Sequence, residues 1–193
     1  GRYICPKKRI CSEDINCFLK MNKKQLRQRL ENQHKHALDT MNGLLEINVA
    51  PATIQFRELK LASGCMDFDR EKKPIQMSIV LDIGNLEGIK SLYELQVTNL
   101  HETGHYVHFT ANPNHLERYL RIADEARKTK EKQEMLKFRA LNEIVAELFV
   151  LHSLDQMDEM KIYTPNEGQI LPAFAYHLPD IIQDREKRVH FLR

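Results

Sequence analysis

The chain has 193 residues, of which 42% are hydrophobic and 29% are charged, and this composition is typical of a globular protein and excludes intrinsic disorder. A formal net charge of +2 is too small for a nucleic-acid-binding or membrane-surface protein. No apolar run reaches the roughly 18 residues that a membrane span needs. We therefore expect a single cytoplasmic domain over residues 1–193, with neither a nucleic-acid nor a membrane partner.

The N-terminal segment, residues 1–20, carries three cysteines at a spacing of six, namely Cys5, Cys11 and Cys17, and Cys65 lies far from them. None of them forms a CxxC pair, whereas zinc and iron–sulfur sites usually have ligands two to four residues apart. Two disulfides, free thiols and a second metal site all remain open for these cysteines.

The first regular element is a helix predicted over about 22–45. Asn22 has the side chain of an N-cap, and the apolar residues that follow it recur at three- and four-residue steps up to the Gly43 region. Pro51 then ends this part of the chain. The pattern predicts a helix that backs a small sheet.

Two strands are predicted next, over about 53–59 and 76–82, with a turn at Gly64 between them. The segment IQMSIVLDI, residues 75–83, has two readings. It is either an ordinary core strand or an edge strand to which an extended peptide adds by main-chain hydrogen bonds. We expect an α+β fold with a small mixed sheet.

Three helices are predicted in the second half of the chain. A capping-box pattern at Ser91 and Glu94 begins the first, over about 92–109. Apolar spacing predicts a second over about 116–126 and a third over about 139–155. We expect the functional cleft between the first and the third.

The predicted helix over 92–109 contains the sequence HETGH, an HExxH motif at residues 101–105. Residues i and i+4 share one face of a helix, so His101 and His105 can bind the same ion while Glu102 stands beside it. Two imidazoles and a neighbouring carboxylate are typical of catalytic zinc, which takes three protein ligands and leaves one position for water. We predict one Zn²⁺ per chain, with Glu102 as the general base.

A second acidic pattern, NEIVAE at residues 142–147, lies on the predicted third helix. Glu143 and Glu147 are also i and i+4, on a helix that is otherwise apolar, and buried carboxylates are costly unless they bind a cation or accept strong hydrogen bonds. Glu143 is therefore predicted as the third zinc ligand, with Glu147 accepting a hydrogen bond from a zinc-bound His. The alternative is that both carboxylates point to solvent.

HETGH followed by NEIVAE resembles the gluzincin metallopeptidases, whose thermolysin-type members pair HExxH with NExxxD on a second helix. The resemblance covers residues 91–155 and implies a zincin-like fold, peptide or protein substrates, and zinc on His101, His105 and Glu143. It also implies that Glu102 is the base and that Asn142 and Glu147 support the ligands from behind. Glu147 departs from the pattern because the family has Asp there.

Other zinc readings of these residues differ in how well they fit. A metzincin needs Gly at position 108 and His at 111, but the chain has His108 and Ala111, so that reading is excluded. His108 lies one turn past His105 and is an alternative third ligand. A zinc-stabilised, non-catalytic interaction module and a zinc hydrolase of non-peptide amides or esters remain alternatives to the peptidase.

The C-terminal subdomain, residues 156–193, supplies further candidates. Hydrolysis of an amide needs a donor to the developing oxyanion, and Tyr163, Tyr176 and His177 are candidates for it, the last two being our predicted catalytic residues. One hypothesis is that the last residues, with His190, fold back over the metal and hold the enzyme in a latent form.

Overall fold

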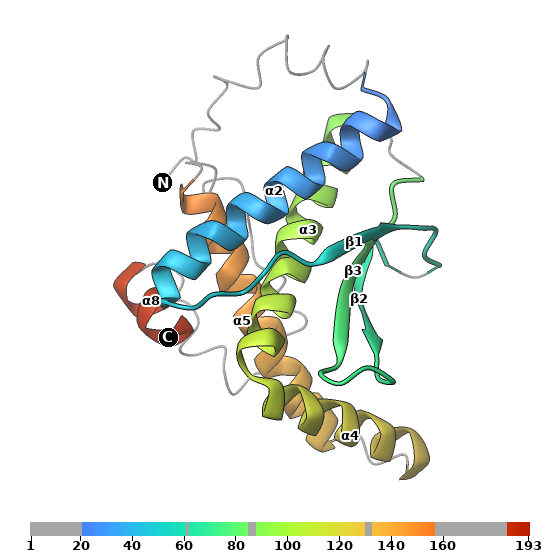
Figure 1. Ribbon diagram of the computed structural model, residues 1–193, viewed down its shortest axis with the longest axis vertical. Helices are drawn as coiled ribbons and strands as arrows, with labels where there is room; N and C mark the ends of the chain where they lie inside the picture. The colour runs from blue at the N-terminus through green and yellow to red at the C-terminus, as the bar shows by residue number, and fades with distance from the viewer. Residues whose placement is uncertain (1–20, 61, 85–87, 130–132, 157–184) are drawn as a thin grey trace, which may run out of the picture.

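The protein is a mixed α/β structure in which helices pack around a three-stranded sheet (Figure 1). It is a computed structural model that describes residues 21–60, 62–84, 88–129, 133–156 and 185–193. The coarse prediction of helices combined with a small mixed sheet is confirmed. None of the described helices is long and apolar enough to cross a membrane.

Helix α2, Lys23–Leu45, is the predicted backing helix. Its N-terminus is closed by a capping box: the Asn22 side chain accepts from the Gln25 N–H at 2.9 Å, and the Gln25 side chain accepts from the Asn22 N–H at 3.0 Å. The helix continues through Gly43 and ends at Glu46, which adopts the left-handed conformation with φ 55°. Its buried face is apolar except for one histidine, and consists of Leu26, Leu30, His34, Ala37, Leu38 and Met41.

The sheet contains β1, Thr53–Phe56, β2, Gly64–Asp69, and β3, Gln76–Leu81, in the order β1-β3-β2. Strand β1 runs parallel to β3, and β2 runs antiparallel to it, so the sheet is mixed as predicted. One expectation was wrong, because Gly64 begins a strand instead of forming a turn. Of the two interpretations of residues 75–83, the core strand is the one observed, since β3 lies at the centre of the sheet. Strand β2 was not predicted, because its sequence GCMDFD contains Gly and Asp, which are rare in strands.

Helix α3, Gly88–Ala111, lies at the centre of the molecule, with α2 along one side of it and α5, Gln133–Gln156, along another (Figure 1). Gly104 allows the close approach of α3 and α5, since a Cβ there would lie 2.9 Å from Phe149 Cβ and 3.0 Å from Ala146 Cα. Helix α4, Pro113–Thr129, follows α3 after a short break, and α8, Arg185–Leu192, packs against α5.

Two apolar clusters hold these elements together. The main core lies between α2, α3, α5 and the sheet, and its fully buried side chains include Leu30, Met41, Ile79, Leu100 and Phe149. A smaller cluster fixes the β2–β3 hairpin to the junction of α3 and α4 and contains Phe68, Met77, Phe109, Leu116, Tyr119 and Leu120. Together they place β2 beside the middle of α3, where the HExxH motif lies.

Candidate metal centre

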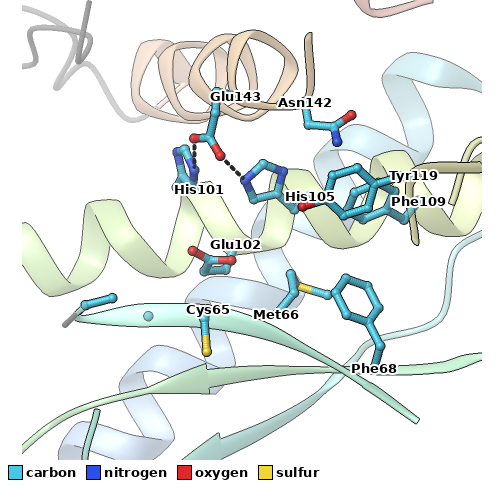
Figure 2. Close-up of a pocket in the computed structure, with 12 residues that line it drawn as sticks. Cys65, Met66, Phe68, His101, Glu102, His105, Phe109, Tyr119, Asn142 and Glu143 are labelled. Carbon is cyan, nitrogen blue, oxygen red and sulfur yellow. Dashed lines mark ion pairs between the residues drawn. The ribbon is translucent and has the colours of Figure 1, made fainter. Parts of the chain in front are cut away.

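The two histidines of the HExxH motif and the glutamate of α5 meet as the sequence predicted. His101 and His105 lie on one face of α3, and Glu143 reaches both of them from α5 (Figure 2). His101 Nε2 lies 2.9 Å from one carboxylate oxygen of Glu143, and His105 Nε2 lies 3.3 Å from the other. The three potential ligand atoms, one from each residue, all lie within 4.8 Å of one another. The three residues could therefore hold a metal ion.

The donor set fits zinc in type and in spacing. Two imidazole nitrogens and one carboxylate oxygen are ligands that a catalytic zinc site uses. Zinc–ligand bonds of about 2.0 Å in a tetrahedron place neighbouring ligand atoms about 3.3 Å apart. The contacts of 2.9 and 3.3 Å between Glu143 and the two imidazoles are close to that spacing, but each uses a different carboxylate oxygen. One ligand atom from each of the three residues lies within 4.8 Å of the others, so the side chains would move closer together around an ion.

Glu147 lies behind His101, one turn further along α5 than Glu143. Its Oε1 is 3.0 Å from His101 Nδ1, which is the contact expected of this glutamate, and its side chain is buried. In the metal-free chain, burial lowers the pKa of His101, but hydrogen bonds with Glu143 and Glu147 outweigh it and raise this pKa to about 10. With Nε2 on a metal, the remaining Nδ1–H would donate to Glu147 and fix the ring orientation.

Glu143 is held as a carboxylate by the same contacts. Burial raises its pKa, but hydrogen bonds from His101 and His105 have the larger combined effect and bring the pKa well below its ordinary value. A carboxylate that stays ionised is the form that binds a cation. A metal ion at His101, His105 and Glu143 would take the place of the contacts between the two imidazoles and this carboxylate.

Glu102 lies next to both imidazoles but does not join the ligand cluster (Figure 2). It is 8% exposed, and burial raises the pKa of its carboxyl group while the charges of His105 and His101 act in the opposite direction. A raised pKa makes a carboxylate a better proton acceptor near neutral pH. This position places a proton-accepting group beside the candidate ligands.

A pocket of about 400 Å³ opens directly on these residues. One wall is α3, with His101, Glu102, His105 and Phe109, and the opposite wall is β2, with Gly64, Cys65, Met66 and Phe68. Tyr119 of α4 and Asn142 and Glu143 of α5 close its remaining sides. The cleft was expected between the two motif-bearing helices. Both helices do line it, but they are in close contact at Gly104, so the pocket opens between α3 and β2.

The back of α3 is fixed by a histidine that the sequence reading did not select. His34 of α2 is 1% exposed; its Nε2 accepts from the Ala52 N–H at 2.9 Å, so its Nδ1–H donates to Thr103 Oγ1, also at 2.9 Å. Thr103 in turn donates to the Asn99 carbonyl oxygen at 2.7 Å. Thr103 lies inside the HExxH motif, so this chain of bonds orients the motif. The sequence does indicate this role of His34, because the residue lies four positions after Leu30 and so shares the apolar face of α2.

Two predicted residues have partners other than those expected. His108 is not part of the ligand cluster; its ring stacks on Phe109 and on His115, and burial, together with the neighbouring His115 and His105, lowers its pKa to about 4. His108 is therefore not the third ligand. Asn142 was expected to support a ligand, but its Oδ1 lies 2.8 Å from His115 Nε2. No residue in the described ranges bonds His105 Nδ1.

Several predicted residues lie outside the described ranges, namely Cys5, Cys11, Cys17, Tyr163, Tyr176 and His177. His190 is described and lies on α8. That helix packs against α5, its Leu192 joins the main core, and Arg193 donates to the Leu44 carbonyl oxygen at 3.3 Å. The pocket is lined by other elements, so the expectation that His190 covers the metal site was wrong.

The chain was compared with families, proteins and structures already known. No protein-family model, curated protein or solved structure matches it. Its function must therefore be argued from the chemistry of the residues around His101, His105 and Glu143.

Proposed function

We propose that this protein is a zinc-dependent hydrolase, and specifically a metallopeptidase of the gluzincin type. The observation that carries the proposal is the convergence of His101, His105 and Glu143, with Glu102 beside them in an open pocket. A pocket of about 400 Å³ falls within the usual range for small-ligand sites. A structural zinc site is normally completed by four protein ligands, whereas three converge in the described part of the chain.

A zinc ion held by these three residues would supply Lewis acidity, lowering the pKa of a water molecule and polarising a carbonyl group. Glu102 would act as the general base and then as the general acid. It would accept a proton from the water as the water oxygen attacks the scissile carbonyl carbon, and would deliver that proton to the amine nitrogen as the C–N bond breaks. Its burial supports this role, because it raises the pKa of the carboxyl group toward that of an effective base.

The pocket walls support a peptide as the substrate. Met66, Phe68, Phe109 and Tyr119 give one part of the pocket an apolar and aromatic lining, in which Phe68 packs edge-on against Phe109 with ring centroids 5.9 Å apart. The side of this lining that faces the pocket would contact an apolar side chain of the substrate. Glu102, Asn142 and the proposed ligands supply polar groups to the same pocket. Polar and apolar groups side by side suit a substrate with an apolar side chain beside a reactive amide.

The test is cleavage of an unstructured casein substrate by the zinc-supplemented full chain, with and without a chelator. Glu102→Gln should abolish cleavage but retain zinc, since Glu102 is not in the ligand cluster. Glu94→Gln is the matched control, because Glu94 is an exposed glutamate on the same helix, and it should cleave at the wild-type rate. Undiminished cleavage by Glu102→Gln would contradict the proposal.

A further inference from the structure

Asn142 presents a hydrogen-bond donor to the pocket. This residue precedes Glu143 on α5, is 3% exposed and lines the pocket wall. Its Oδ1 accepts from His115 Nε2 at 2.8 Å. Figure 2 shows its amide nitrogen on the side that faces His105 and Tyr119. The amide oxygen is thus hydrogen-bonded to His115, and the amide nitrogen faces the pocket.

Among the described residues, the amide nitrogen Nδ2 of Asn142 has no hydrogen-bond acceptor. This nitrogen is not among the polar atoms that the protein cuts off from solvent, so it is open to an acceptor on a molecule that enters the pocket. A group that enters the pocket with a free acceptor would complete this donor, so the residue points to a ligand rather than to a role in folding.

His115 fixes which end of the amide faces the pocket. It lies in the first turn of α4, and its ring stacks on His108 with centroids 4.8 Å apart and on Phe109 at 5.9 Å. These stacked rings hold the imidazole in place. Because its Nε2–H occupies Asn142 Oδ1, the amide cannot turn its oxygen toward the pocket without losing this bond.

We propose that Asn142 is a substrate-binding residue whose Nδ2 donates to a backbone carbonyl of a peptide held beside the metal ligands. His115 is the positioning residue that keeps this donor turned toward the peptide. A neutral amide donor suits a peptide carbonyl, which is a neutral acceptor present in every residue of the substrate. This inference rests on the proposed function, because it assigns a partner to the same pocket.

The binding step can be tested without turnover. Metal-free full chain labelled with ¹⁵N-asparagine is titrated with N-acetyl-L-phenylalaninamide, which has two carbonyl groups and an aromatic ring. The Asn142 side-chain signal is identified by its loss in Asn142→Asp. We expect a saturable shift of this signal and none for the exposed Asn32. An Asn142 signal that does not move, or moves only as Asn32 does, would overturn the inference.

Kinetics separate binding from positioning. For peptide cleavage, Asn142→Ala should raise KM about tenfold with kcat changed less than twofold, and His115→Phe should change KM in the same direction. His115→Gln restores an N–H donor to Asn142 Oδ1 and should recover most of the wild-type KM, while the exposed His36→Phe should have no effect. Equal losses in His115→Gln and His115→Phe would contradict the positioning role. Absence of cleavage in the wild type contradicts the proposed function, and the titration then decides the inference alone.

Discussion

Acidification should destabilise the protein through His34. The folded state requires this histidine to be neutral, because Nε2 accepts from the Ala52 N–H and a protonated ring would place two donors against each other. Burial, with the nearby charge of Lys35, lowers its pKa from 6.5 to about 4. Neutral His34 therefore contributes its full stability above about pH 6.5. As the pH falls from 6.5 to 4, the unfolded chain binds a proton at this histidine and the folded chain resists doing so, and the contribution is lost.

The size of the effect follows from these two pKa values. Between pH 7 and pH 4.5 the linkage relation gives a loss of about 2 kcal/mol in the free energy of unfolding from His34 alone. Urea unfolding of chelator-treated protein at both pH values measures it. His34→Gln should remove this part of the pH dependence, whereas His36→Gln, an exposed histidine on the same helix, should retain it. Equal pH dependence in wild type and His34→Gln would refute the reasoning.

Three further predictions follow from the helices. Gly104→Ala should lower the free energy of unfolding, measured in urea, by about 1–3 kcal/mol, because its Cβ would meet the α5 backbone at 3.0 Å. Gly43→Ala, with open space around it, should raise the free energy of unfolding by up to about 1 kcal/mol, and a change of the same sign in both variants would be contrary to this packing. Glu147→Gln should weaken zinc binding about 10- to 100-fold in a competition titration, and unchanged affinity would remove its role behind His101. Asn22→Ala should lower thermal stability by about 1 kcal/mol, measured by circular dichroism, and an unchanged midpoint would show that the capping box is dispensable.

The helices and the grouping of His101, His105 and Glu143 could be predicted because their signals are local. Spacing of three and four residues identified α2, α3, α4 and α5, and the i, i+4 rule placed His101 and His105 on one face. The cost of burying a carboxylate identified Glu143 on a separate helix. Each of these arguments uses the periodicity of one helix or the desolvation of one charge.

The pocket could not be predicted because its walls depend on contacts between distant segments. Strand β2 lacks the β-branched pattern of a strand and is fixed by its pairing with β3 and by the close approach of Gly64 to α3, where a Cβ would lie 2.6 Å from Thr98 Cγ2. The His115 contact with Asn142 joins residues 27 positions apart on different helices. Sequence spacing carries no information on either contact, so β2 was not predicted as a wall of the pocket.

The most direct test of the metal centre is the zinc content of the purified full chain, measured by mass spectrometry after exposure to zinc and removal of free ion. We predict about one zinc per chain in the wild type and in the exposed control His36→Ala, and a loss of bound zinc in His101→Ala and in Glu143→Ala. No zinc in the wild type, or equal zinc in all four proteins, would contradict a metal site formed by His101, His105 and Glu143.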